Sequence, residues 1–386
     1  MTTATGGPLR GVTILDTTNM LMGPYATLVL AQFGARVVKV EPLDGDIARR
    51  INDVTGQQAG PIHLNANRGK ESVALDLRDA ADRALFDRMV ATADVVAHNR
   101  PPGSDVRLGL DYATLSATNP RIIVCGMHGY GSTGPYGPLP AYDDAMQAIS
   151  GLAAAQSWGS EPQYVRSPVT DKITALMAAS AIAAALYERR ESGVGQYVEV
   201  PMLETIVQFL MIEQQCGYVF DPPRGPIGYP RSLSPYRRPM RTADGLIGLL
   251  PSTDAQWHGV FDVLDAGELA TDPRFATVEA RSEHIDELYA WLAAELAIRA
   301  TDALLAGFLE RRVPAMRVNS MEDLFTDPHL TATGYFQATE HPDLGRLRHA
   351  APPVRFSRSG TVAGGPAPRL DQDRDRVEAG LPVPPG

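Results

Sequence analysis

The sequence predicts an α/β fold in which a mostly parallel sheet is covered by helices on both faces. Two observations lead to this prediction. Short apolar segments typical of buried strands alternate with segments of helical character through the first half of the chain. The strand candidates are apolar along their length, as strands of a sheet covered on both faces are. Because parallel strands need long crossovers, β-α-β alternation favours the parallel arrangement.

The elements of the first half follow from local signals. The predicted strands are residues 12–16, 36–41, 72–77, 94–97, 121–125 and 196–200. The predicted helices are residues 24–33, 80–92, 171–192 and 203–216. Gly34 and Pro42 end the first helix and the second strand, since glycine and proline interrupt regular structure. Leu85, Phe86 and Met89 give the helix at 80–92 one apolar side.

The second half predicts a smaller domain between two parts of a larger one. Residues 221–239 are dense in proline, glycine and arginine, which is typical of a linker. A strand is predicted at 246–250, followed by helices at 257–264, 279–298 and 302–311. The tail from Ser357 has few large apolar groups, so we expect it to be extended or partly disordered. We therefore place the large domain at 1–220, the linker at 221–240 and the small domain at 241–329, with 330–386 completing the large domain.

Composition excludes several classes of protein. The 386 residues carry a net charge of −10, which argues against broad binding of nucleic acid or of membranes but leaves room for a local basic pocket. The two cysteines suggest no disulfide framework and show no metal-type spacing. No basic region followed by an apolar stretch begins the chain, and the weakly polar run 173–186 is shorter than the roughly 20 residues of a membrane span. We expect a soluble cytoplasmic protein.

Asp171 is the candidate catalytic residue. It begins the helix predicted at 171–192, where unpaired backbone N–H groups and the positive end of the helix dipole face a first-turn carboxylate. Hydrogen bonds to the charged form predict that Asp171 is ionised at neutral pH. Such a carboxylate can attack an activated acyl carbon and become acylated. The alternative is that Asp171 only caps its helix, as aspartate commonly does.

A glycine-rich loop follows the strand predicted at 121–125. Gly129, Gly131 and Gly134 allow the backbone to approach a ligand closely, and the carboxyl ends of strands form the ligand crevice of open α/β sheets. The spacing is not that of a dinucleotide-binding loop, and no phosphate-binding lysine follows. An ordinary surface turn is the alternative.

Polar and basic side chains lie near predicted strand ends. Arg68 and Lys70 precede the third strand, and Asn99, Arg100 and Arg107 follow the fourth. Arginine and lysine at such positions suit a phosphorylated ligand, while a solvated surface is the alternative for each residue. No Gly-x-Ser-x-Gly elbow of a serine hydrolase is present.

An ordered series of motifs resembles the family III CoA-transferases, the group that includes formyl-CoA transferase and crotonobetainyl-CoA:carnitine CoA-transferase. The matching segments are residues 9–11, 23–24, 33–42, 45–46, 67–70, 99–103, 107–110, 129–135, 142–143, 147–148, 193–196, 243–245, 272–275 and 313–315. The resemblance covers about residues 8–328. It implies a large Rossmann-like α/β domain built from both ends of the chain, a smaller middle α+β domain, and two chains interlocked as a homodimer.

The resemblance also implies the activity. CoA contacts are expected near Asn99, Arg107 and Leu108, and at Arg68 and Lys70. Asp171 would attack the thioester of an acyl-CoA to form a mixed anhydride; CoA would then form a thioester with the aspartate, and a carboxylic acid would collect the CoA. Coenzyme A and acyl-CoA are thus substrates, and no permanently bound cofactor or metal is expected.

The superfamily also includes α-methylacyl-CoA racemase, which moves a proton next to the thioester. Tyr142 and Arg241 stand where that enzyme has a histidine and a glutamate, and neither replacement is a suitable base, which favours transfer over racemisation. A racemase with Asp171 as base, or an inactive CoA-binding homologue, remains the alternative. Leu21, Met22 and Tyr142 are candidate substrate-pocket residues. The apolar Leu21 and Met22 favour a bulky acyl group, or else belong to the core.

Overall fold

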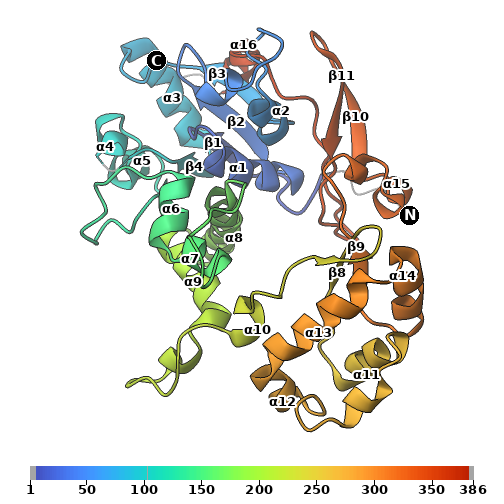
Figure 1. The fold of residues 1–386 in the computed structure, drawn as a ribbon. Helices are drawn as coiled ribbons and strands as arrows, with labels where there is room; N and C mark the ends of the chain where they lie inside the picture. Colours follow the sequence, from blue (N-terminus) through green and yellow to red (C-terminus); the bar gives the residue numbers. More distant parts are fainter. Residues whose placement is uncertain (1–5, 102, 382–386) are drawn as a thin grey trace. The chain divides into compact units, whose positions relative to one another are not determined.

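The computed structural model describes residues 6–101 and 103–381, which form two compact units (Figure 1). The first unit contains the described residues of 1–152, 164–209 and 332–386, and the second contains 153–163 and 210–331. The second unit thus begins earlier than the predicted small domain, because it takes the end of the helix α9 (Met202–Gln214) and a separate segment at 153–163. Each unit is described by itself.

A six-stranded parallel sheet organises the first unit, in the order β3-β2-β1-β4-β5-β6. Its strands are β1 (Thr13–Asp16), β2 (Arg36–Glu41), β3 (Glu71–Ala74), β4 (Val95–His98), β5 (Ile123–His128) and β6 (Tyr197–Pro201). This is the strand order of the Rossmann fold, so the predicted fold class is confirmed. The order reverses between β1 and β4, and ligands of such sheets bind outside the carboxyl ends of the strands at that point.

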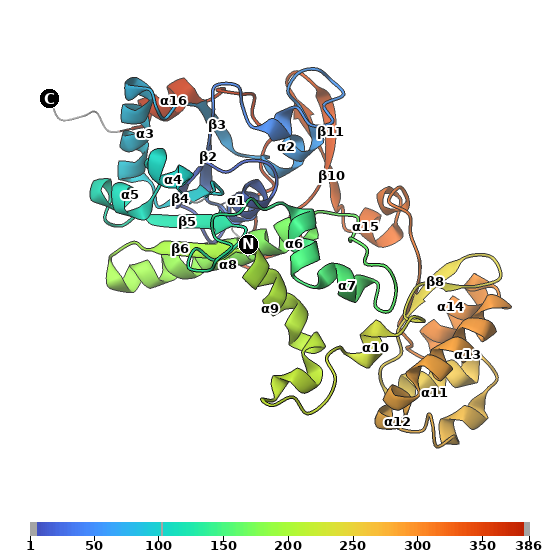
Figure 2. The ribbon, with the colours of Figure 1, turned by 60° about the vertical axis from the view of Figure 1, so that its left-hand side comes forward.

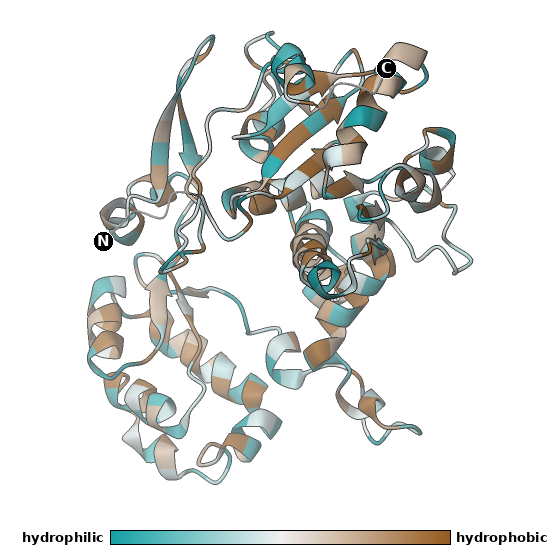
Figure 3. Ribbon diagram, turned by 180° about the vertical axis from the view of Figure 1, so that it is seen from behind, coloured by the Kyte–Doolittle hydropathy of each residue, from teal (hydrophilic) through white to brown (hydrophobic). Residues whose placement is uncertain are grey.

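Helices cover both faces of this sheet. Ile14, Val37 and Ile123 point to one face, where they pack with α1 (Met22–Gln32) and α8 (Val169–Ser192). Alternate residues such as Leu15, Val38 and Val124 pack on the other face. There they meet α3 (Ala80–Thr92), α5 (Tyr112–Thr118) and α16 (Arg374–Ala379). The strands are largely hydrophobic in Figure 3, which explains why their sequence predicted them well.

The helix α8 is the longest element and is longer than its apolar run at 173–186 suggested. Its 24 residues have the length and composition of a membrane span, a property that core helices of soluble proteins share. Ala175, Ala178 and Ile182 are buried in the core with α1 and the sheet. The helix ends at Gly193, whose φ of 76° is the left-handed conformation that favours glycine at a helix C-terminus.

Short helices that the sequence analysis did not predict connect these elements. They are the 3₁₀ helix η1 (Ile47–Arg49) and the α-helices α2 (Pro61–Ala66), α4 (Ser104–Arg107) and α6 (Asp143–Ile149). A further short helix, α7 (Leu152–Gln156), follows α6 along the chain (Figure 2), and all but its first residue is assigned to the second unit. Each spans two turns or fewer, which is too short for a helical periodicity to be visible in the sequence. Two of them, α4 and α6, carry residues of the candidate site.

The C-terminal segment returns to the first unit. It contains a hairpin of β10 (Phe336–His341) and β11 (Gly345–Ala350), and then reaches the edge strand β3. Asp371 and Asp373 accept hydrogen bonds from the backbone N–H groups of Ala74 and Ser72 at 2.7 and 2.9 Å. The predicted disorder of the tail is therefore wrong for this part of it. Its carboxylates satisfy the free N–H groups of an edge strand.

The second unit combines a small antiparallel sheet with helices. The sheet consists of β7 (Met240–Arg241), β8 (Leu246–Leu249) and β9 (Ala315–Arg317). Its helices are η2 (Cys216–Val219), α10 (Pro230–Leu233), α11 (Asp254–Val263), η3 (Gly267–Thr271), α12 (Val278–Glu283), α13 (Ile285–Ala297), α14 (Thr301–Glu310), η4 (Asp323–Phe325) and α15 (Pro328–Ala332). The helix predicted at 279–298 is two helices that meet at His284, and the predicted linker is mostly irregular.

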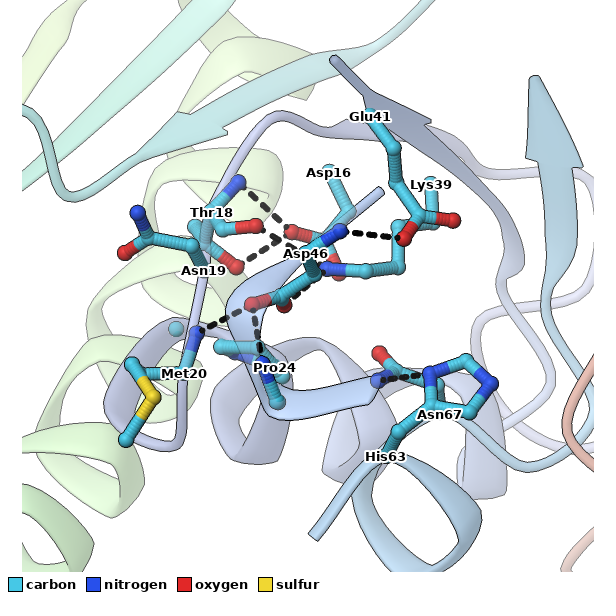
Figure 4. Close-up of polar contacts among 12 residues, drawn as sticks. Asp16, Thr18, Asn19, Met20, Pro24, Lys39, Glu41, Asp46, His63 and Asn67 are labelled. Carbon is cyan, nitrogen blue, oxygen red and sulfur yellow. Dashed lines mark hydrogen bonds and ion pairs between the residues drawn. The ribbon is translucent and has the colours of Figure 1, made fainter. Parts of the chain in front are cut away.

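A buried ionic network holds the loop that follows β1 (Figure 4). Lys70 donates to Asp16 Oδ2, Pro24 O, Thr27 Oγ1 and Asn67 Oδ1 at 2.8 to 2.9 Å. Burial opposes the ionisation of Asp16, yet the charges of Lys70 and Lys39 hold the pKa of Asp16 far below its usual range. The ion pair is fully enclosed, with both side chains 0% exposed.

A second part of the network fixes the backbone of that loop. The ammonium of Lys39 binds Thr18 O at 2.9 Å and Asp46 Oδ2 at 3.0 Å. Asp46 Oδ1 in turn accepts the backbone N–H of Met20 at 3.0 Å (Figure 4). Met20 has a φ of 62°, a strained conformation for a residue other than glycine. The network therefore holds a strained turn directly before α1.

Lys70→Met should destabilise the protein by about 3–5 kcal/mol, because it leaves the Asp16 carboxylate buried without its ion pair. Chemical denaturation measures the free energy of unfolding. Arg78→Met is the matched control, since Arg78 pairs with Asp76 at the surface and should cost less than about 1 kcal/mol. If both variants lose the same free energy of unfolding, the enclosed ion pair contributes no more to stability than a surface ion pair.

Candidate active site

Asp171 lies in the first turn of α8 and is half-buried. The residue before the helix, Pro168, makes no side-chain cap. The sequence therefore placed Asp171 correctly at a helix N-terminus, where a carboxylate is electrostatically favoured. Its surroundings decide whether it is a cap or a reactive group.

The helix is capped by another carboxylate, that of Asp143 in α6. Asp143 Oδ1 accepts the backbone N–H groups of Thr170 and Asp171 at 2.8 and 3.0 Å, and the hydroxyl of Thr170 at 2.6 Å. The expectation that such hydrogen bonds would hold Asp171 itself ionised is wrong, because Asp143 occupies those donors. The reading of Asp171 as a simple helix cap fails for the same reason.

The pKa of Asp171 is raised to about 7. Burial is the largest cause, the nearby charge of Asp143 adds to it, and the charge of Lys172 opposes it. Near neutral pH the carboxyl group therefore exists in both protonation states. A carboxylate of raised basicity, free of a capping role, can act as a nucleophile or as a general base.

A cavity of about 870 Å³ opens beside this turn in the first unit. Pro168, which precedes α8, and Lys172, which follows Asp171, belong to its wall, whereas Asp171 itself does not. Leu28, Val29 and Leu176 are among its apolar members. Its dimensions are those of a small-molecule site.

The three candidate substrate residues have separate places. Leu21 lines the cavity, as a substrate contact could. Met22 does not: it is 7% exposed and packs in the core between the sheet, α1 and α8, so its assignment to a pocket is corrected. Tyr142 precedes α6 and is 80% exposed.

The structure separates the two basic residues predicted before β3. Arg68 is 5% exposed and lines the same cavity, with one nitrogen donating to Ala350 O at 2.9 Å. The ammonium of Lys70 is enclosed by the four oxygen acceptors of the buried network. We therefore correct the prediction that Lys70 contacts CoA: its role is to hold the framework.

Asn99 lies at the switch point of the sheet, where it joins the loops after β4 and β1. Its side chain donates to Asn19 O and accepts from Asn19 N, both at 3.0 Å. Both polar atoms of the amide are thus engaged, and Asn99 sets the distance between the two loops. These two hydrogen bonds restrain the loops that border the crevice at the switch point.

Arg107 and Leu108 lie at the end of α4, in the loop after β4. Arg107 is exposed and pairs with no carboxylate in the described parts of the chain. Leu108 closes the helix, and its carbonyl accepts from Arg83 at 2.7 Å.

Among the described residues, both ring nitrogens of His98, Arg100 Nε and Asp105 Oδ1 are buried without a hydrogen-bond partner. Unsatisfied buried groups are rare, and several in one segment indicate a place for water or ligand.

The glycine loop follows β5 and is tied to β6 and α9. Gly131 N and Ser132 N donate to Glu204 and Glu199 at 2.9 and 2.8 Å. A Cβ atom at Gly129 would lie 2.0 Å from that of Ala141, so only glycine fits there. Tyr130 packs in the same core as α8, while Ser132 and Gly134 are exposed.

The sequence analysis named Asp143 only as part of a motif and missed its contacts. It lies 28 residues before Asp171, so no local spacing reveals the interaction. The enclosure of Lys70 was equally invisible, since Asp16 in β1 and Pro24 and Thr27 in α1 lie more than 40 residues away in the sequence. Within residues 6–101 and 103–381, no three His, Cys, Asp or Glu side chains gather as a metal site would need.

Comparison with known proteins agrees with the fold. The sequence pattern of CoA-transferase family III matches residues 9–374. The succinate–glutarate CoA-transferase of Agrobacterium fabrum is 32% identical, covering 97% of this chain and 96% of the relative. The acetyl-CoA:oxalate CoA-transferase of Acetobacter aceti is 36% identical over 75% of both chains. The crystal structure of a CAIB/BAIF family protein from Brucella suis has a TM-score of 0.82 and 30% identity, covering 97% of this chain and 99% of that one.

Asp171→Asn should make the protein more stable at pH 8. A carboxyl group whose pKa is about 7 when folded and about 4 when unfolded stabilises the fold less as pH rises through this window, because the unfolded state releases its proton first. We expect a gain of about 1–3 kcal/mol at pH 8 that shrinks toward pH 4. Thermal unfolding across pH measures it.

Asp144→Asn is the matched control for that experiment. Asp144 is the exposed neighbour of Asp143 in α6 and does not contribute to the pKa of Asp171. It should show no such pH-dependent gain. A variant at Asp171 that is no more stable than the wild type at pH 8 would contradict the raised pKa.

Proposed function

This chain belongs to CoA-transferase family III and is a CoA-transferase, and on that premise we propose that Asp171 is the nucleophile through which it moves CoA from an acyl-CoA to a carboxylic acid. The observation that supports this role is a half-buried carboxyl group at the start of α8 that does not cap the helix and has a pKa of about 7. A group of this kind combines basicity with access to the ionised form at neutral pH.

The proposed reaction has four acyl transfers. A carboxylate oxygen of Asp171 attacks the thioester carbonyl, the C–S bond breaks, and an anhydride and CoA thiolate form. The thiolate attacks the aspartyl carbonyl, which releases the donor acid and leaves an aspartyl-CoA thioester. The acceptor carboxylate then attacks that thioester, giving a second anhydride and the thiolate. Finally the thiolate attacks the acceptor carbonyl, which forms the product acyl-CoA and restores Asp171.

We place the CoA moiety at the carboxyl edge of the sheet. Arg107 is an exposed cation that pairs with no carboxylate among the described residues, and such a guanidinium suits a phosphate group. The buried, unsatisfied atoms of His98, Arg100 and Asp105 lie in the same segment. The loop at the switch point, which Asn99 and Asn19 hold rigid, forms part of this edge.

The glycine loop would protect the intermediates. Anhydrides are cleaved by water, so the route needs a shielded site. Gly129, Gly131 and Gly134 belong to a loop whose base packs with α8 and whose tip is exposed, an arrangement suited to a cover over bound substrate.

The alternative chemistry is proton transfer at the carbon next to the thioester. A group with a pKa of about 7 would also serve as a general base. Two observations argue against proton transfer. Tyr142 and Arg241 stand where the racemase has a histidine and a glutamate. The relatives are also named as CoA-transferases. Deuterium exchange at the α-carbon of an acyl-CoA without acyl transfer would favour the alternative.

The relatives are named for dicarboxylic acids, namely succinate, glutarate and oxalate. We propose that the acceptor is a carboxylic acid of this general class, and a panel should begin with these three acids and their CoA thioesters. The apolar wall that Leu21 contributes makes a more hydrophobic acid the next choice.

Asp171→Ala should abolish CoA transfer, at least about 10³-fold, while CoA binding and thermal stability are retained. In the wild type, incubation with acyl-CoA followed by hydroxylamine should convert Asp171 to a hydroxamate that mass spectrometry locates. Normal turnover by the variant would remove Asp171 from the mechanism.

Arg107→Ala should weaken CoA binding by about tenfold through loss of a charge-assisted contact to phosphate. Calorimetry measures the affinity. Arg190→Ala is the control, because Arg190 is an exposed arginine in the last turn of α8. Unchanged affinity for the Arg107 variant would exclude this residue from the CoA site.

We propose a homodimer. Leu176, Met177 and Tyr187 on α8 and Phe209 on α9 are between 42% and 70% exposed, and burial of such large apolar side chains would favour association with a second chain. Light scattering coupled to size-exclusion chromatography should give twice the chain mass at micromolar concentration. A monomer would contradict the proposal.

A further inference from the structure

We propose that Asp143 is a positioning residue for the nucleophile: by occupying the N-terminal N–H groups of α8, it leaves the Asp171 carboxylate uncapped and faces it with a fixed negative charge. This inference rests on the proposed function of Asp171. The first step is the geometry of Asp143 Oδ1, which receives three donors from Thr170 and Asp171 at 2.6 to 3.0 Å.

The other oxygen of Asp143 is engaged as well. Asp143 Oδ2 accepts from Gln147 Nε2 at 2.7 Å, and Gln147 Oε1 accepts from Val165 N at 2.9 Å, which fixes the orientation of the amide. Asp143 also belongs to the first turn of its own helix, α6. Four donors thus engage the two oxygens of Asp143 and fix the position of its carboxyl group beside the first turn of α8.

The consequence for Asp171 is electrostatic and geometric. A first-turn aspartate normally turns back to the free N–H groups of its helix, but here those donors are taken. Its carboxylate is free to point elsewhere. The like charge of Asp143 adds to burial in raising the pKa of Asp171.

Among the described residues, no neighbour other than Asp143 raises the pKa of Asp171 by its charge. Lys172, on the same helix, acts in the opposite direction, and its ammonium binds Ser167 Oγ at 2.6 Å. The helix α1, which packs along α8, carries no acidic or basic side chain. The ionisable groups of β5 and β6 are Cys125, His128, Tyr197 and Glu199, and none contributes to the pKa of Asp171.

The chemistry gives this arrangement a purpose. Acyl transfer from a thioester to an ordinary carboxylate is uphill, because a carboxylate is a much better leaving group than a thiolate. A more basic carboxylate attacks faster and forms a less activated anhydride, so the step becomes less unfavourable. Asp143 would thereby bring the first anhydride closer in free energy to the thioester.

Asp143→Asn tests the inference, since the amide oxygen can still cap α8 while the charge is lost. The acidic limb of the pH profile of kcat should move to lower pH by about one unit, and kcat at pH 8 should fall about three- to tenfold. KM for the acyl-CoA should change less than about twofold, because Asp143 lies outside the proposed CoA site. Asp144→Asn removes one charge from the same helix and should change neither limb nor rate.

A second variant separates charge from capping. Asp143→Ala removes both the charge and the acceptor of the Thr170 and Asp171 N–H groups. Its pH limb should move at least as far as that of Asp143→Asn. Its thermal stability should fall further than that of Asp143→Asn, because the two N–H groups lose their acceptor.

The inference fails if Asp143→Asn, folded by circular dichroism, retains the wild-type pH limb and kcat. It also fails if Asp143→Ala moves the pH limb and Asp143→Asn does not, since Asp143 would then act as a helix cap only. Hydroxylamine labelling of Asp171 in the wild type separates these results from a failure of the proposed function. If hydroxylamine labels Asp171 in the wild type but Asp143→Asn keeps the wild-type pH profile of kcat, only the role of Asp143 is overturned and the proposed function stands.

Discussion

The candidate active site depends on a competition for the free N–H groups at the start of α8. Two carboxylates lie close enough to accept them, and Asp143 is the one that does. A helix cap is a satisfied, weakly basic group, so the carboxylate that loses this competition is the more reactive one. Burial and the charge of Asp143 raise the pKa of Asp171. Because Asp171 is excluded from the cap, no helix N–H group offsets these two effects, as the proposed nucleophile requires.

A second constraint keeps the neighbouring loop in place. The enclosed charges of Asp16, Lys70, Lys39 and Asp46 could not be buried singly, because each would lose its hydration. Together they satisfy one another and bind the backbone of residues 18–20. The loop after β1 is thus fixed at the switch point of the sheet, where Asn99 connects it to the loop after β4. Rigidity at that point is what a site built on loops requires.

The sequence was sufficient for elements whose signals are local. The strands β1 to β6 are apolar, and the long helices α3 and α8 have periodic or alanine-rich patterns, so their positions follow within a few residues. Asp171 was also recognisable, because a helix start is a local feature. Contacts between distant segments left no such signal: Asp143 caps a helix that begins 26 residues later, and Lys70, which resembled a phosphate ligand by position, is enclosed in the network. The tail at 371–379 looked too polar to be ordered, yet its carboxylates pair with an edge strand.

The most direct measurement follows oxygen atoms. In the proposed route, one oxygen of the acceptor carboxylate remains on Asp171 when the product acyl-CoA leaves. Turnover with an acceptor acid labelled with ¹⁸O in both carboxylate oxygens, followed by tryptic digestion, isolates residues 167–172, whose only side-chain carboxyl group is that of Asp171. We predict that this peptide gains one ¹⁸O atom in a single turnover and at most two after many turnovers. An unlabelled peptide from protein that has turned over would mean that CoA passes to the acceptor without covalent participation of Asp171.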